Sequence, residues 1–107
     1  MDFQEFTQKA LSIREKYAEL EKKKYGKEWT TEQIAQGFVG DVGDLMKLIQ
    51  AKNGVRAIED VDAKLAHELS DCLWSILVLA EKYNVDLEKS FAKTMEELDI
   101  KLTKELE

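Results

Sequence analysis

Two pairs of acidic residues are the part of this sequence best suited to chemistry. They are Asp41 with Asp44 and Glu68 with Asp71, and the members of each pair are three positions apart. On an α-helix, residues three apart share a face, with Cβ atoms about 5–6 Å from each other. If the two helices pack together, four carboxylates meet and raise each other's pKa. A hard divalent cation, which prefers oxygen ligands, resolves that repulsion, so these four residues are candidate metal ligands.

Each acidic pair also has a simpler interpretation. In a chain of which 36% is charged, an isolated Asp-x-x-Asp is more often a solvated helix face. Lys64 precedes Glu68 by four residues and is a local candidate for an ion pair with it. The second pair, however, comes just before the apolar segment 72–80, and carboxylates are rarely buried unless they are paired or bind metal. From spacing alone, the metal site and the solvated surface both stay open.

The hydrophobic pattern predicts four helices to position these residues. A stripe of apolar residues at spacings of three and four indicates a first helix, which Gly26 ends. Thr30 and Gln33 fit a capping box at the start of the second helix, and Asp86 fits the N-cap of the fourth. The predicted helices cover residues 2–24, 30–52, 62–83 and the segment after 86. We therefore expect one all-α domain over residues 1–107, a four-helix bundle-like protomer.

Two further features bear on packing. The segment 72–80 is apolar nearly all round, so it needs burial on every side. Four helices in a short monomer rarely provide that, and we expect a homodimer or homotetramer assembled mainly through the third helix. Gly37, Gly40 and Gly43 lie inside the second helix, where each glycine costs about 1 kcal/mol relative to alanine. They suggest close approach by a neighbouring helix or a ligand.

Composition limits the choice of partners and compartment. The net charge of −6 argues against binding to nucleic acid or to an acidic membrane. The single cysteine, Cys72, has no disulfide partner, which favours a reducing compartment. We find no signal-peptide pattern and no apolar run of transmembrane length, so we expect a cytoplasmic protein.

The two acidic segments together resemble the MazG-like nucleotide pyrophosphohydrolases of the all-α NTP pyrophosphatase superfamily. The matching segments are Phe-Val-Gly-Asp-Val-Gly-Asp-Leu at 38–45 and Glu-Leu-Ser-Asp-Cys-Leu-Trp at 68–74. The family pattern is E-x-x-E, a gap, and then E-x-x-D. Here both glutamates of the first half are aspartates, which keep the charge but reach one methylene less far. The segment 83–88 is similar to the family's link into its fourth helix.

The resemblance implies an enzyme that converts a nucleoside triphosphate and water into a nucleoside monophosphate and pyrophosphate, clearing unwanted nucleotides. It implies Mg²⁺, with Mn²⁺ as an alternative, and four residues as metal ligands and catalytic groups: Asp41, Asp44, Glu68 and Asp71. Lys93 is the nearest candidate for a phosphate contact. Trp29 is either a stacking platform for the base or a residue that packs the entry to the second helix.

Three alternatives stay open at this point. Two are relatives with a narrower substrate, either a deoxypyrimidine triphosphate or phosphoribosyl-ATP. The third, from another class, is a non-catalytic helical oligomerisation module that retains the scaffold. Metal-dependent release of pyrophosphate separates the enzymes from the module.

Overall fold

The secondary structure consists of four α-helices and no strand in the computed structural model, which describes residues 1–107. The helices are α1 (Phe3–Tyr25), α2 (Thr31–Lys52), α3 (Val61–Lys82) and α4 (Leu87–Leu106). The all-α prediction is confirmed, and the predicted helix bounds agree with the structure to within one residue.

The helix ends follow from local side-chain chemistry. The Thr30 side chain accepts a hydrogen bond from the Gln33 N–H at 3.2 Å, and the Gln33 side chain accepts one from the Thr30 N–H at 2.9 Å. This is the predicted capping box. Gly26 ends α1 with φ of 81°, a left-handed conformation that glycine adopts without a steric penalty. The Asp86 side chain accepts from the Lys89 N–H and so caps α4, as predicted.

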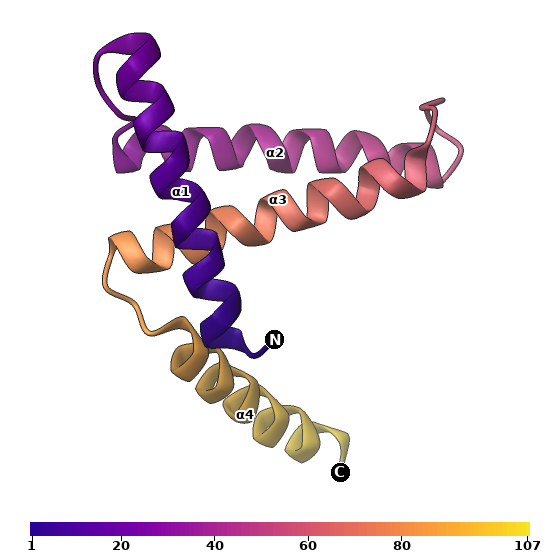
Figure 1. The fold of residues 1–107 in the computed structure, drawn as a ribbon. Helices are drawn as coiled ribbons and strands as arrows, with labels where there is room; N and C mark the ends of the chain where they lie inside the picture. The colour runs from indigo at the N-terminus through magenta and orange to yellow at the C-terminus, as the bar shows by residue number, and fades with distance from the viewer.

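The pair α2 and α3 forms the body of the molecule (Figure 1). These two helices lie side by side and run in opposite directions, while α1 crosses them and α4 turns away from α2. Trp74 of α3 joins α1 to this body, because its Nε1–H donates to the Ala10 carbonyl oxygen at 3.0 Å. The Tyr17 and Trp74 rings pack at 5.6 Å between centroids. The antiparallel α2–α3 contact is what brings the two acidic pairs together.

This single chain is an open array of helices. Its radius of gyration is 17.2 Å, against about 13 Å for a compact domain of the same length. Only 10 of 107 residues are buried, and none of them lies on α4. The small core consists of seven apolar residues from the first three helices: Ala10, Ala18, Ile34, Leu48, Cys72, Leu77 and Val78. Most of the apolar stripe of α4 therefore remains exposed.

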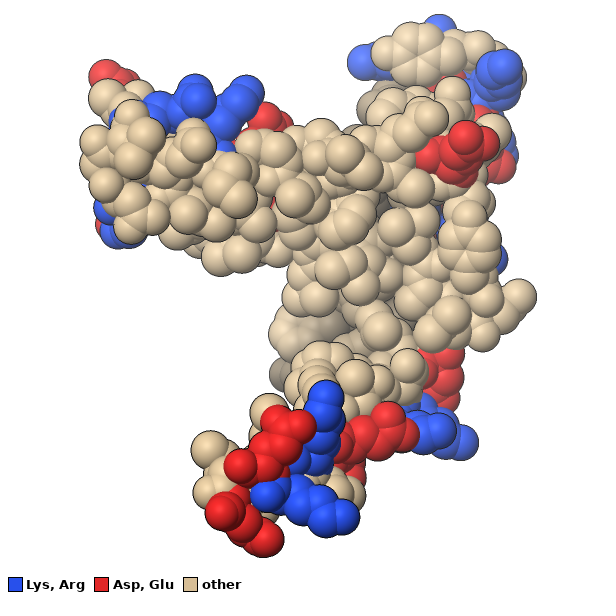
Figure 2. Space-filling model, turned by 180° about the vertical axis from the view of Figure 1, so that it is seen from behind, with Lys and Arg blue, Asp and Glu red and all other residues tan.

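The predicted all-round burial of the third helix does not occur within one chain. Leu73 and Ile76, which lie within the segment 72–80 of α3, are exposed. Figure 2 shows a broad face with few charged side chains over the body of the molecule, and charged residues at its ends and over α4. Assembly of several copies stays a prediction. None of the helices combines the length and the apolar character that crossing a membrane requires.

Candidate functional site

Three of the four predicted acids meet between α2 and α3. Asp41 and Asp44 come from α2 and Glu68 from α3, and each offers one carboxylate oxygen within 4.8 Å of the other two. No other group of three Asp, Glu, His or Cys side chains converges in this way. We call these three residues the acid cluster. Their roles as ligands or catalytic groups stay predictions.

The acid cluster disfavours its own negative charge. Burial raises the pKa of Glu68, and the charges of Asp41, Asp71 and Asp44 raise it further. The pKa of Asp41 is also raised, by burial first and then by Asp71 and Asp44. In addition, the buried Oε2 atom of Glu68 has no hydrogen-bond partner. A buried carboxylate oxygen without a hydrogen-bond partner destabilises the folded protein.

Asp71, the fourth predicted acid, lies beside the acid cluster. It is close enough for its charge to raise the pKa of both Asp41 and Glu68. One of its carboxylate oxygens lies 3.2 Å from Nε2 of His67, one helical turn earlier. His67 is exposed, so this contact orients Asp71 from the solvent side.

The protein itself offers the acid cluster little positive charge. Lys64, the local candidate for an ion pair with Glu68, forms no ion pair with it. Lys47 approaches Asp44 at 3.9 Å, but both side chains are exposed, where such a pair contributes little. The neighbouring Cys72 thiol has a raised pKa, mainly because it is buried, so it stays protonated. The donor set is thus carboxylate oxygen alone, which fits a hard divalent cation such as Mg²⁺.

An aromatic pocket of about 260 Å³ adjoins the acid cluster. Tyr17, Trp29 and Trp74 contribute rings to its lining, and Asp41 contributes its carboxylate side chain. The remaining lining residues are Arg14, Glu21, Ile34, Gly37 and Ser75. A planar, apolar ring system held here would have its attached polar groups beside a cluster carboxylate.

A more open cavity of about 500 Å³ lies on the other side of the acid cluster. Asp44 and Glu68 line it, together with Lys47, Lys64 and His67. The acid cluster therefore lies between an aromatic pocket and a cavity that carries both acidic and basic side chains, with Asp60 adding a further acid. A ligand with an aromatic ring at one end and negative charge at the other would fit this arrangement if a bound cation offset the acidic residues.

Trp29 packs the entry to α2, one of its two predicted roles, and its stacking on a base stays a prediction. Its ring packs over Gly37 at the entry to α2, where an added Cβ would lie 3.2 Å from the ring. The same side chain remains 44% exposed and lines the aromatic pocket. A close neighbour is present only at Gly37, and it is the Trp29 ring rather than the expected helix or ligand. Nothing lies within 4 Å of a Cβ built on Gly40 or Gly43.

Lys93 is not part of this constellation in the single chain. It lies on α4, which turns away from α2 in Figure 1, and its ammonium lies 3.9 Å from Glu97 on the same helix. Its side chain is exposed. A phosphate contact by Lys93 stays a prediction that the single chain does not support.

Sequence reasoning missed two functional candidates, Arg14 and Glu21. Both belong to α1 and are buried, and they form a doubly hydrogen-bonded ion pair in the wall of the aromatic pocket. The available signal was a pair of opposite charges seven residues apart, beside the small apolar residues Ala10 and Ala18. Positions seven apart complete almost two helical turns and so share a face.

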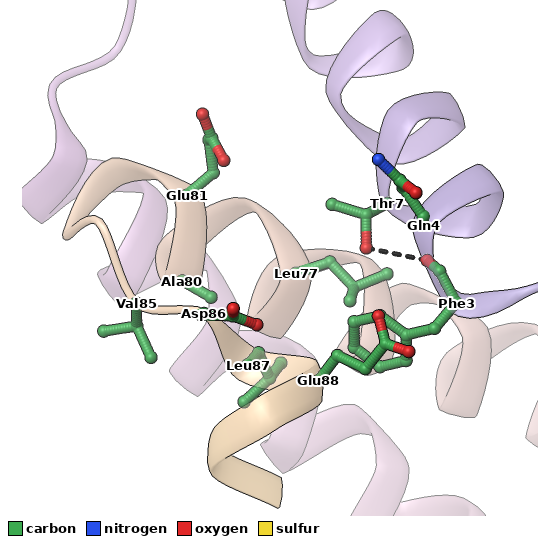
Figure 3. Close-up of a pocket in the computed structure, with 10 residues that line it drawn as sticks. All are labelled: Phe3, Gln4, Thr7, Leu77, Ala80, Glu81, Val85, Asp86, Leu87 and Glu88. Carbon is green, nitrogen blue, oxygen red and sulfur yellow. Dashed lines mark hydrogen bonds between the residues drawn. The ribbon is translucent and has the colours of Figure 1, made fainter.

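A cavity of about 380 Å³ lies elsewhere, between the start of α1, the end of α3 and the start of α4 (Figure 3). Phe3, Leu77 and Leu87 line it along with Glu81 and Glu88. Two further polar side chains of this cavity are used within the fold. The Thr7 hydroxyl donates to the Phe3 carbonyl at 2.9 Å, and Asp86 caps α4. Its acids do not converge, so we place the functional site at the acid cluster.

Comparison with known proteins shows the family of the chain. The family model of the MazG nucleotide pyrophosphohydrolase domain matches residues 29–102, which include Trp29, the acid cluster and Asp71. No curated protein and no solved structure gives a match to the chain.

Proposed function

Since this chain belongs to the MazG nucleotide pyrophosphohydrolase domain family, we propose that it is a Mg²⁺-dependent nucleoside triphosphate pyrophosphohydrolase. It converts a ribo- or deoxyribonucleoside triphosphate and water into the monophosphate and pyrophosphate. The proposed role is to clear unwanted nucleotides.

The observation that carries the proposal is the unsatisfied state of the acid cluster. Asp41, Asp44 and Glu68 converge with raised pKa values at two of them, and one buried Glu68 oxygen has no partner. A protein that used these residues only for folding would do better with neutral side chains. A bound cation would compensate the negative charge of these carboxylates and would also bind the phosphates of a polyphosphate ligand.

These residues, with Asp71, would hold Mg²⁺, which binds through carboxylates, substrate phosphate oxygens and waters. When bound, the ion supplies positive charge to the triphosphate and makes a nearby water more acidic. The chain's own contribution is to orient the substrate and to accept a proton. A carboxylate of the acid cluster that does not bind the ion directly could accept the proton of the attacking water.

The two cavities suggest the direction in which the substrate binds. The base occupies the aromatic pocket, where Trp29 and Trp74 offer ring surfaces for stacking. The outer phosphates extend towards Lys47 and Lys64 in the more open cavity. The α-phosphate then lies at the acid cluster, between the two.

The proposal is tested with a panel of NTPs and dNTPs in Mg²⁺, scored for pyrophosphate. Reaction in ¹⁸O-labelled water should place the label in the monophosphate, since attack at the α-phosphorus makes pyrophosphate the leaving group. Label in pyrophosphate would mean attack at another phosphorus. The same panel identifies a narrower enzyme if only deoxypyrimidine triphosphates react, and phosphoribosyl-ATP is tested beside it.

The exposed apolar surfaces favour assembly of several copies, in addition to catalysis or in place of it. Leu73 and Ile76 of α3, and Phe91, Met95 and Leu98 of α4, are all exposed in one chain. Burial of such residues contributes about 25 cal/mol per Å² of apolar surface. We expect at least a dimer in light scattering at micromolar concentration. An oligomer that releases no pyrophosphate from any nucleotide would favour the non-catalytic module.

A further inference from the structure

The strongest unexplained feature outside the acid cluster is the ion pair between Arg14 and Glu21. Nη1 of Arg14 donates to Oε2 of Glu21 at 3.2 Å, and Nη2 donates to Oε1 at 2.5 Å. Their side chains are 5% and 11% exposed. Both residues therefore occupy positions on α1 that an apolar pair could fill.

The ion pair makes one further contact, and it leads to the aromatic pocket. Oε1 of Glu21 accepts a hydrogen bond from the backbone N–H of Trp29 at 2.8 Å. The next residue, Thr30, is the N-cap of α2. The Glu21 carboxylate on α1 thus fixes the backbone just before α2, the helix that carries Asp41.

Trp29 is held from a second side by α2. Its ring lies over Gly37, whose missing side chain leaves the necessary space. Gly37 precedes Asp41 by one helical turn, and all three residues line the aromatic pocket. The position of the Trp29 ring relative to the acid cluster is therefore set by Glu21 at the backbone and by Gly37 at the ring.

Stability alone is a weak reason for this arrangement. Replacing a buried ion pair by well-packed apolar residues is often neutral or stabilising. What an apolar pair does not provide is a directed acceptor for one backbone N–H. Glu21 stays ionised in this role: burial raises its pKa, but the hydrogen bonds from Arg14 and Trp29 outweigh that effect and leave the pKa lowered.

We infer that Arg14 and Glu21 are positioning residues that hold Trp29 as a wall of the base pocket and so set how tightly the base of the substrate binds. The inference rests on the proposed function for the identity of the ligand. It assigns to α1, all of which lies outside the family match, a part in substrate specificity. Neither residue touches the reacting phosphate.

The test separates positioning from stability with two variants of opposite expected behaviour. The double variant Arg14→Met/Glu21→Leu keeps side-chain volume and should fold stably, but it offers no acceptor to Trp29. Its KM for a nucleoside triphosphate should rise about tenfold with kcat little changed, since stacking a base on an aromatic ring has a binding effect of about that size. Inhibition by inorganic pyrophosphate, a product of the proposed reaction that has no base, should be unaffected.

The conservative variant Glu21→Gln keeps an acceptor oxygen but leaves Arg14 without its counter-ion. It should lose stability while its KM, measured at a temperature where it is folded, stays close to that of the wild type. Gly37→Ala perturbs the Trp29 ring without touching the ion pair and should reproduce the rise in KM. An unchanged KM in both the double variant and Gly37→Ala overturns the inference.

A binding measurement keeps this inference separate from the proposed reaction. Protein labelled with 5-fluorotryptophan should give two ¹⁹F signals, because the chain has two tryptophans, and Trp29→Phe assigns one of them. AMP and CMP should shift the Trp29 signal of the wild type and shift it less in the double variant. If no triphosphate is hydrolysed, the proposed function is wrong, and this titration still decides the inference: equal shifts in both proteins overturn it.

Discussion

Glu21 on α1 and Glu68 on α3 are both largely shielded from solvent, but their surroundings affect their charge in opposite directions. The surroundings of Glu21 stabilise the ionised carboxylate, and those of Glu68 destabilise it. Glu21 receives hydrogen bonds from Arg14 and from the Trp29 backbone, so its pKa is lowered despite burial. Glu68 faces Asp41, Asp71 and Asp44, so burial and like charges together raise its pKa. One glutamate is fully partnered within the chain, and the other has a buried oxygen without a partner.

The difference shows how to distinguish a structural carboxylate from a functional one. A buried charge normally requires a partner, and a partner supplied by the fold stabilises the folded state. Where the fold supplies none, and adds further negative charge instead, compensation has to come from outside the chain. Variants at Glu21 and Glu68 test this contrast.

The largest effect is expected for Glu68→Gln. Pyrophosphate release should fall at least about 100-fold, because the variant loses a ligand charge and a candidate proton acceptor together. The metal-free variant should nevertheless melt at a higher temperature than the wild type, since the ionised form of Glu68 is disfavoured in the fold. Calorimetry and circular dichroism give the melting temperature and confirm that the helices persist.

The control for Glu68→Gln is the addition of metal. Mg²⁺ should raise the melting temperature of the wild type, because a ligand that binds only the folded state stabilises it. It should raise that of Glu68→Gln much less. Full activity in this variant would remove Glu68 from the site.

Glu21→Gln should show the opposite pattern. Removing one partner of a buried ion pair typically costs about 3–5 kcal/mol, since the other charge is left uncompensated. Urea denaturation should therefore show a lower free energy of unfolding, with the activity per folded molecule largely retained. Lys47→Met, which breaks the exposed pair with Asp44, is the matched control and should change stability by less than about 1 kcal/mol. A similar loss in both variants would mean that burial of Glu21 is unimportant.

The pH dependence of stability should separate the two regions within one protein. Glu21 has a lowered pKa, so its contribution is present above the pKa of the unfolded chain and is lost as the pH falls through the folded value. Glu68 and Asp41 have raised pKa values, so they destabilise the fold at neutral pH, and protonation relieves this as the pH falls. The metal-free protein should therefore be most stable at weakly acidic pH.

Single variants assign the two limbs of that profile. Melting temperatures across the pH range should show a flatter neutral limb in Glu68→Gln and a flatter acidic limb in Glu21→Gln. Saturating Mg²⁺ should also flatten the neutral limb of the wild type. A wild-type profile that rises steadily from acidic to neutral pH without metal would contradict the assignment for the acid cluster.

The sequence predicted what depends on local pattern. The helix bounds follow from periodicity and from caps such as Thr30 with Gln33, and the convergence of Asp41 with Glu68 follows from spacing once two helices pack. Hydrophobic patterning did not identify the pair Arg14 and Glu21, because it treats charged residues as surface. The sequence also does not determine how far α4 turns away from α2, because the apolar stripe of α4 can be buried equally well by its own chain or by another copy.

The three glycines of α2 also show what sequence spacing cannot predict, namely the neighbour that a residue meets. Three glycines in one helix indicated close approach, but the partner differs from one position to the next. At Gly37 the close neighbour is a tryptophan from the preceding turn, whereas Gly40 and Gly43 face open space in one chain. Periodicity identifies a helix face, but it does not say what occupies the space in front of it.

The smallest effect concerns the reach of the two aspartates in the acid cluster. Asp41 and Asp44 stand where the family pattern has glutamates, and each is one methylene shorter. Since nothing approaches Gly40 or Gly43, closer helix packing does not compensate for this within one chain. Mg²⁺ demands nearly ideal octahedral geometry and keeps waters readily, so we expect weak Mg²⁺ binding without nucleotide. Mn²⁺ also suits carboxylate sites, and activity with Mn²⁺ should at least equal activity with Mg²⁺.

The double variant Asp41→Glu/Asp44→Glu tests this reach directly. It keeps every charge of the acid cluster and adds one methylene at each position, so it changes distance without changing electrostatics. If reach limits metal binding, the variant should need less Mg²⁺ for half-maximal rate, because the longer side chains come closer to the octahedral geometry that Mg²⁺ demands. The ratio of Mn²⁺ to Mg²⁺ activity should fall in parallel. An unchanged or higher Mg²⁺ requirement would show that the backbone of α2 already places the shorter side chains correctly, and that charge alone governs the contrast between Glu68 and Glu21.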